Sequence, residues 1–545
     1  MSETMELQPV AVASNLTIPY PRVSRDSSRV AFGGSDPQDN DNVAHNEVSS
    51  SPPLVPAQNS TLQLVLVILQ PSLVNFLASF GNGIIAVGLP AIAQSIDLPR
   101  SLYLWPSSVY SLTSGSMLLI AGSVADIVGV RPVELVGVFL LGIFTLACGL
   151  SATGVQLVVF RALQGVALAM HLPASVALVA AAVPPGRSRN IGYACLGLSQ
   201  PLGFSVGLVV SGIIVEKTGW RMGFYLSGGA MLVAAIAAVW TLPKVKAGPQ
   251  GTDGIRLRTK LYTEVDWIGG LIVGGGLAIL AYVLAILSAD LTTIHSATTA
   301  SLLSVSLLLL IAFPFWMQYR EATGKSALVP NALWKNIPFA TTCIMVALSY
   351  GMINSMELFS SLYFQEVQNH SPFTTSLYLL PNLSMGVLIN LSVGIFVDRV
   401  PVRWLVAISS LLCAIAPLIM ALVNPAWSYW YLEFWGQILA PISGDVLFTV
   451  GLIIVSDNFP EKTQALAGAV FNTVAQFGQS LGIGLCQVVA LGVMGKDGAD
   501  GKNGAEKELK GYRAGFWTMF AYMVVCGLMA VGGLRSAGKV GLKRE

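Results

Sequence analysis

Charged side chains inside apolar runs are the residues of this chain best suited to chemistry. Arg161, Glu357 and Asp445 each interrupt a hydrophobic stretch long enough to cross a membrane. An ionisable residue in hydrocarbon costs roughly 3 kcal/mol or more, so it is a functional candidate where it faces a polar cavity. A carboxylate held away from water exchanges protons near physiological pH. These residue types predict proton exchange and the binding of a polar ligand inside a membrane.

Arg161 belongs to a short pattern, Arg161-Ala-Leu-Gln164-Gly165. Residues three and four apart share a helical face, so Arg161 and Gln164 are expected to reach one polar cavity, with Gly165 allowing close packing beside them. The alternative is an arginine that snorkels to the outer end of its helix. His171, farther along the same run, is expected to be a packed or bridging residue rather than a proton site.

Asp445 is the carboxylate that we expect to exchange protons, because it lies near the middle of its apolar run. Glu357 shares a helical face with Asn354 and is a candidate second site. The alternative for Asp445 is a structural hydrogen bond between two helices. Together with Arg161 and Gln164, these carboxylates form the predicted coupling site for substrate and proton.

A ten-residue pattern, Gly-x3-Asp-x4-Arg, occurs twice, at Gly122–Arg131 and at Gly394–Arg403. The copies lie 272 residues apart, each between long apolar runs, which is typical of a membrane protein built from repeats. The glycine permits close helix approach, and the aspartate can pair with a cation on another bundle. We therefore expect a gate latch at each copy. The candidate gate residues are Gly122, Asp126, Arg131, Gly394, Asp398, Arg399 and Arg403.

The composition places these residues in a membrane protein. Of 545 residues, 54% are hydrophobic and 11% are charged, whereas soluble domains carry about 25% charged residues. The net charge of +2 and the scattered basic residues argue against a nucleic-acid partner. The six cysteines lack metal-ligand spacing, and neither a P-loop nor a nucleophile and base arrangement is recognisable. We expect no enzyme, no metal and no cofactor.

Fourteen apolar runs between residues 62 and 535 are long enough to span a bilayer, among them 375–396 and 430–454. A backbone in hydrocarbon must satisfy its own hydrogen bonds, and the alternating pattern of barrel strands is missing. The predicted fold is therefore all-α and polytopic, with about 14 transmembrane helices. An even number places both termini on one side, and the distribution of Lys and Arg favours the cytosol.

The repeated pattern divides the spans into two six-helix bundles with an inserted pair of helices between them. Residues 1–60 are rich in Ser, Asn, Pro, Asp and Gln, which predicts a disordered cytosolic tail. The other predicted parts are the first bundle at 61–243, a cytosolic linker with the inserted pair at 244–336, the second bundle at 337–535 and a cytosolic tail at 536–545.

With this arrangement the sequence resembles the major facilitator superfamily, and within it the fourteen-span drug:proton antiporters and fungal permeases of the aminotriazole-resistance type. The resemblance covers most of residues 62–535. It rests on the Gly122–Arg131 loop, on Arg161–Gly165 and on the loop Gly219–Tyr225. It implies alternating access between the two bundles, with substrate bound between them.

Two positions depart from the antiporter pattern. Gly81 stands where the subgroup often has an acidic residue. In the fifth span Pro201 is retained, but the expected Gly-Pro and Gly-Gly pairs are broken, and Gly203, Gly207 and Ser211 form a small-residue face instead. A proline bend and close helix packing are expected there, whereas proton coupling must use other carboxylates.

The function that we expect is secondary active transport, in which a proton gradient drives export of a small organic molecule such as a drug, toxin or secondary metabolite. The alternatives are uptake or vacuolar transport of a solute, and a receptor that retains the fold without transport. The expected partners are the substrate, protons and the lipid bilayer, and the chain is expected to act as a monomer. The plasma membrane is favoured, with the vacuolar membrane as the alternative. Asn369, in Asn369-His-Ser371, is a predicted glycosylation site in an outside loop.

Overall fold

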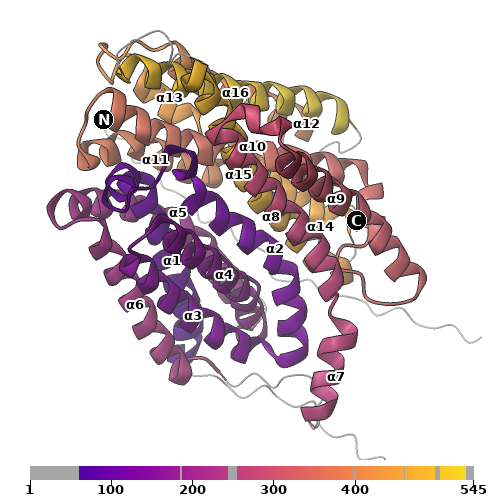
Figure 1. The fold of residues 1–545 in the computed structure, drawn as a ribbon. Helices are drawn as coiled ribbons and strands as arrows, with labels where there is room; N and C mark the ends of the chain where they lie inside the picture. The colour runs from indigo at the N-terminus through magenta and orange to yellow at the C-terminus, as the bar shows by residue number, and fades with distance from the viewer. Residues whose placement is uncertain are drawn as a thin grey trace, which may run out of the picture. The chain divides into compact units, whose positions relative to one another are not determined.

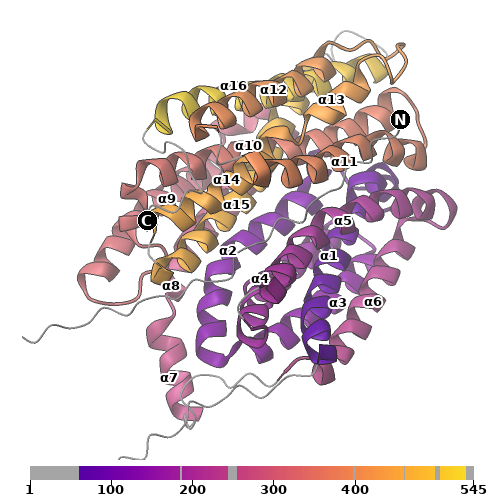
Figure 2. The ribbon, with the colours of Figure 1, turned by 180° about the vertical axis from the view of Figure 1, so that it is seen from behind.

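The structure is a computed structural model that describes residues 61–184, 187–243, 254–396, 400–459, 461–496 and 504–535. The chain divides into the units Met1–Gln58 and Asn59–Glu545, and all of the described residues belong to the second unit. Their regular structure is entirely helical (Figures 1 and 2), which confirms the all-α prediction. The predicted tails at 1–60 and 536–545 lie outside the described residues, and so do the candidate gate residues Asp398 and Arg399.

Six long helices of the first half pack together. They are α1 (Thr61–Ser95), α2 (Trp105–Val128), α3 (Val130–Leu150), α4 (Gly154–Ala182), α5 (Arg187–Lys217) and α6 (Trp220–Thr241), with the short turn η1 (Arg100–Leu102) before α2. Within this group α1 packs on α5, α2 on α4, and α3 on both α4 and α6. Their sequences are apolar around most of the helix circumference, as helices that face both lipid and protein require.

The second half repeats this arrangement after an inserted segment. The inserted segment comprises α7 (Gly254–Glu264), α8 (Trp267–Ala289), η2 (Leu291–His295) and α9 (Ala297–Ala322), followed by η3 (Asn331–Lys335). The later helices are α10 (Ile337–Leu362), η4 (Tyr363–Val367), α11 (Pro372–Phe396), α12 (Val402–Leu422), α13 (Glu433–Leu439), α14 (Ile442–Asn458), α15 (Glu461–Lys496) and α16 (Gly504–Gly533). Within this group α12 packs on α16, and α10 packs on α15, α16 and α14.

Helices from the two halves meet along two main seams, one between α2 and α15 and one between α5 and α11. In the first seam Gly115 of α2 lies against Phe477 of α15. The inserted helices α8 and α9 pack on each other, and α8 also packs on both α2 and α15. The inserted pair therefore lies beside the first seam, at the junction of the two bundles.

Thirteen helical segments in the described residues are long and apolar enough to cross a membrane. α11 is not among the thirteen, although it forms one continuous helix over the predicted span 375–396. The span predicted at 430–454 is not one uninterrupted helix, because α13 ends at Leu439 and α14 begins at Ile442. Pro441 lies at this break and supplies no backbone N–H for a continuing helix. The predicted span is nevertheless confirmed, because Glu433–Val455 is one of the thirteen segments, and the polytopic all-α architecture is confirmed with it.

Candidate functional site

Arg161 is fully buried inside the first bundle, with 0% of its surface exposed. Its guanidinium donates to the Pro106 carbonyl oxygen, to Asn82 Oδ1 and to Gln164 Oε1, each at 2.8 Å. It also lies 4.2 Å from the centre of the Tyr110 ring, close enough for a cation–π interaction. This burial is the opposite of what a snorkelling arginine requires. All of these partners are neutral, so the hydrogen bonds orient the positive charge without neutralising it.

Gln164 connects Arg161 to helix α3. Its side-chain carbonyl accepts from Arg161, and its Nε2 donates to Thr145 Oγ1 of α3 at 2.8 Å. Gly165, the next residue, allows α4 to approach α2 so closely that any side chain there would collide with Tyr110 and Thr113. The Arg161–Gly165 pattern therefore serves both polar bonding and packing, as helical spacing predicts.

Gly81 borders the same network. A Cβ added to Gly81 would lie 4.0 Å from Gln164 Nε2, and the neighbouring Asn82 accepts from Arg161. The position at which the resembling antiporters often carry an acid thus faces the Arg161 cluster. In this chain the neutral amide of Asn82, next to Gly81, is a partner of Arg161.

Glu357 and Asp445 come together in the second bundle. Glu357 lies on α10 and Asp445 on α14, and the two carboxylates are close enough to interact electrostatically. Tyr350, two turns before Glu357, also interacts with Asp445 and lies near the ring of Phe448. Both carboxylates remain partly accessible, although their helices pack closely. The structure thus joins two of the predicted coupling residues that are 88 positions apart in the sequence.

The Gly122–Arg131 loop forms the turn between α2 and α3. Gly129 adopts a φ of 106° at this turn, a conformation that favours glycine. Arg131 donates to the carbonyl oxygens of Val239 and Leu242, at the end of α6. These bonds satisfy carbonyls that a helix end leaves unpaired. Arg131 thus binds within the first bundle, at the end that we call the motif face.

The other candidate gate residues form no ion pairs between the bundles in the part of the chain that the structure describes. Asp126 is exposed at the end of α2 and forms no ion pair with another described residue. A Cβ added to Gly122 would lie 3.9 Å from Pro173 of α4. In the second copy Gly394 lies in α11, and Arg403, at the start of α12, stacks on Trp404. In the part of the chain that is described, neither copy forms an ion pair between the bundles.

The predicted packing residues of α5 lie against α1. A side chain at Gly203 would collide with the backbone of Phe76, and a Cβ at Gly207 would lie 2.7 Å from the backbone of Phe80. Pro201 lies inside the same helix, where it removes one backbone hydrogen bond. These residues bring two backbones into direct contact, as a small-residue face allows.

Sequence reasoning missed a buried pair beneath the motif face. Glu134 of α3 and His171 of α4 are both fully buried, and His171 Nδ1 lies 2.9 and 3.0 Å from the two carboxylate oxygens. The expectation that His171 bridges helices is confirmed. Glu134 had no comparable signal, because it lies at the start of its apolar run, where an acid is easily read as a loop residue.

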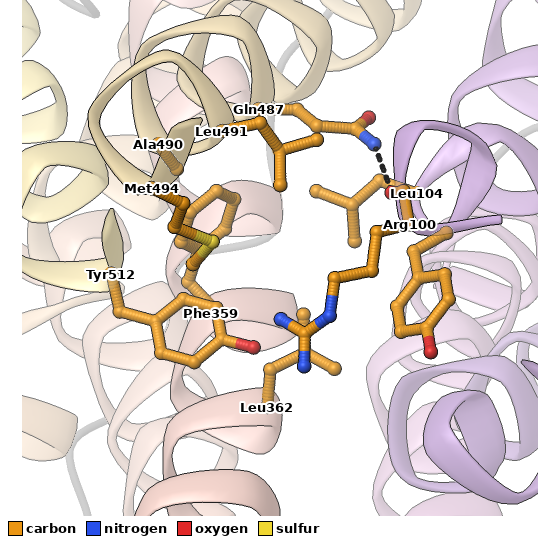
Figure 3. Close-up of a pocket in the computed structure, with 10 residues that line it drawn as sticks. Arg100, Leu104, Phe359, Leu362, Gln487, Ala490, Leu491, Met494 and Tyr512 are labelled. Atoms are coloured by element: carbon orange, nitrogen blue, oxygen red, sulfur yellow. Dashed lines mark hydrogen bonds between the residues drawn. The ribbon is translucent and has the colours of Figure 1, made fainter. Parts of the chain in front are cut away.

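A second cluster without a local sequence signal lies at the opposite end of α2, on what we call the far face. Arg100 of η1 donates from one guanidinium nitrogen to Glu366 at 3.0 Å and to Glu508 at 2.5 Å. Tyr512 donates to the same oxygen of Glu366. Arg100, Gln487 and Tyr512 line a small cavity. Figure 3 shows Arg100 and Tyr512 pointing toward each other across it, with Gln487 above Arg100. The cluster joins the first bundle to the second.

The comparisons with known proteins agree with the observed fold. The family model described as Major Facilitator Superfamily matches residues 72–483 and 375–540. This match spans most of the chain. The chain belongs to the Major Facilitator Superfamily.

Individual superfamily members give the same result. The chain is 38% identical to "MFS-type transporter 1" of Pyricularia oryzae, over 88% of this chain and 85% of that protein. It is 28% identical to the "Aminotriazole resistance protein" of Saccharomyces cerevisiae, over 75% of this chain and 72% of that one. A solved bacterial homolog of the human lysosomal transporter Spinster superposes with a TM-score of 0.61 at 14% identity, covering 88% and 98% of the two chains. The protein is therefore a multi-pass membrane transporter of small molecules rather than an enzyme.

Proposed function

We propose that this transporter exports a small organic molecule in exchange for protons, by alternating access between the two bundles. The observation that carries the proposal is the pair of carboxylates, Glu357 and Asp445, which interact inside membrane-spanning helices. Two carboxylates that interact away from bulk water hold a proton more readily than one alone. The proton gradient is then the energy source, and no bound cofactor is required.

Arg161 is the proposed counterpart of these carboxylates in the first bundle. Its charge is fixed by three neutral hydrogen-bond acceptors and by the face of Tyr110. A buried cation whose partners are all neutral is suited to orient a polar or anionic group of a substrate. Because Arg161, Glu357 and Asp445 all come from one chain, the proposed mechanism needs only a monomer.

The direction of transport is part of the proposal. One similar protein carries a name that denotes resistance to aminotriazole, and export is the direction of transport that gives resistance to an external toxin. We place the protein in the plasma membrane with both termini in the cytosol, in agreement with the Lys and Arg distribution. The candidate gate residues Asp126 and Asp398 then lie on the cytosolic side.

The experiment begins by comparing the small molecules inside and outside cells with and without the protein, since a retained compound names the substrate and the direction. That compound is then followed in proteoliposomes under an imposed pH gradient. Asp445→Asn is expected to abolish gradient-driven transport while exchange of labelled for unlabelled substrate continues, because exchange needs no net proton movement. Glu264→Gln, at an exposed site at the end of α7, is the matched control. Gradient-driven transport that survives Asp445→Asn would exclude this carboxylate as the proton site.

A further inference from the structure

The far-face cluster is the point at which charged side chains cross between the bundles. Arg100 precedes α2 of the first bundle, whereas Glu366 follows α10 and Glu508 lies in α16 of the second. One nitrogen of Arg100 serves both carboxylates, and Tyr512 of α16 donates to Glu366. Hydrogen bonds between ionised groups are about twice as strong as neutral ones. This cluster therefore holds the two bundles together on the far face.

Neutral contacts reinforce the same junction. Gln487 of α15 donates to the carbonyl oxygens of Arg100 and Ser101, at 3.0 and 2.8 Å. Gln365 donates to the Val87 carbonyl oxygen of α1 at 2.9 Å. The hydroxyls of Ser108 in α2 and Ser480 in α15 lie 2.8 Å apart. The far face is thus closed by a set of polar bonds, and Arg100 carries the charged bonds among them.

The charges in the cluster do not balance. When both carboxylates are ionised, the single cation Arg100 faces two negative charges, Glu366 and Glu508. Among the described residues, the other titratable groups that pack on the cluster are Tyr103, directly after η1, and Tyr512 of α16. The remaining neighbours, such as Phe359, Gln487 and Met494, do not titrate. Binding of one proton would therefore still leave one ionised carboxylate as the partner of Arg100.

The segment that carries Glu366 has an unusual backbone. η4 is a π-helical turn that continues α10, and such turns are rare and frequent at functional sites. The same helix carries Glu357, nine residues earlier, which corresponds to about 13 Å along a helix axis. Glu366 and the proposed proton site are thus parts of one rigid element.

We propose that the Arg100 cluster is a proton-operated latch of the far face. A proton from water on that side binds a carboxylate oxygen of Glu508, forming an O–H bond and removing one negative charge. The protonated carboxyl is then a neutral hydrogen-bond partner of Arg100, so the interaction between the two side chains weakens. The bundles can then separate on this face. No other covalent bond changes. The latch thereby links the arrival of an external proton to opening toward the outside.

The inference rests on the proposed function for its direction, but the opening of the latch can be measured without transport. Leu104 lines the cavity behind Arg100 and is buried. Leu104→Cys reports opening through its rate of reaction with a membrane-impermeant thiol reagent added from the far face. Ser428→Cys, exposed in the loop between α12 and α13, corrects for the effect of pH on thiol reactivity. The protein without an introduced cysteine gives the background from the native cysteines.

The quantity measured is the reaction rate of Leu104→Cys with the thiol reagent, divided by that of Ser428→Cys. We expect this ratio to rise on the order of tenfold when the far side is acidified from about pH 7.5 to about pH 5.5. A change of this size corresponds to the loss of one charge-assisted bond. Glu508→Gln is expected to raise the ratio at neutral pH and to flatten its pH dependence. Leu491→Cys, in the same cavity, provides a second reporter if Leu104→Cys disturbs folding.

Two outcomes overturn the latch: a ratio that does not respond to far-side pH, or a Glu508→Gln variant that behaves like the parent protein. These results are separable from the fate of the proposed function. Gradient-driven transport with a pH-independent ratio refutes the latch alone. A pH-dependent ratio without gradient-driven transport refutes proton-coupled export and leaves the latch in place.

Discussion

At the scale of single residues, Arg161 and His171 are buried ionisable groups of the first bundle that have different kinds of partner. Arg161 is held by neutral acceptors, whereas His171 is held by the carboxylate of Glu134. Among the described residues, the first arrangement leaves the charge of Arg161 without a counter-ion. The second pairs Nδ1 of His171 with the carboxylate of Glu134, between α4 and α3, while Nε2 of His171 is buried without a partner. We therefore assign transport chemistry to Arg161 and structural support to the Glu134–His171 pair.

The structural assignment of Glu134 and His171 predicts strong coupling between them. Removing one member leaves the other buried and unpaired, which costs about 3–5 kcal/mol. Replacing both with leucine removes both polar groups, so the double variant is expected to be less destabilised than the sum of the single leucine variants. Thermal unfolding of the purified protein in detergent measures all four members of the cycle. Additive losses of stability would show that the two side chains act independently.

At the scale of helices, the close contact between the backbones of α1 and α5 depends on glycines of α5. A methyl group at Gly203 meets the backbone of Phe76 on α1, and that backbone cannot rotate away. Gly197 lies on the same helix, but a Cβ there meets nothing within 4 Å. Substitution by alanine therefore adds a methyl group into a filled site at Gly203 and into open space at Gly197.

We expect Gly203→Ala to destabilise the protein by about 2 kcal/mol, the usual scale of overpacking. Gly197→Ala is expected to be neutral or slightly stabilising, because alanine favours helix and meets open space. The melting temperature in detergent distinguishes the two variants. If both alanines lowered it equally, helix packing at Gly203 would not be the cause.

Sequence patterns predicted the features that depend on neighbours along one helix. Apolar runs predicted the long helices, and the three-residue spacing of Arg161 and Gln164 predicted their shared bonding. The break at Pro441 was missed because a proline inside an apolar run is compatible with a kinked membrane helix as well as with two helices. The Arg100 cluster was missed because its partners are 266 and 408 positions away. Only the three-dimensional arrangement of the bundles brings them together.

At the scale of the whole molecule, the orientation in the membrane decides whether the far face or the motif face lies outside the cell. Asn369 lies in the loop between η4 and α11, on the same face as the Arg100 cluster, and is exposed with a φ of 56°. We expect this asparagine to carry a glycan, which requires the far face to be outside. Endoglycosidase treatment should increase the mobility of the wild-type protein and leave Asn369→Gln unchanged.

A mobility shift that persists in Asn369→Gln would place the glycan elsewhere. The sequence also contains acceptor tripeptides at Asn15 and Asn59, so a glycan there would reverse the predicted orientation. In that case the Arg100 latch would face the cytosol, and its response to pH would have to be measured from the cytosolic side.

The position of the inserted helix pair makes the two sides of the molecule unequal toward the lipid. α8 packs on both α2 and α15, so this seam between the bundles is backed by protein. Among the described helices, neither α8 nor α9 packs on α5 or α11, which form the other seam. The seam between α2 and α15 is therefore covered by α8, whereas the seam between α5 and α11 has no such cover from the inserted pair.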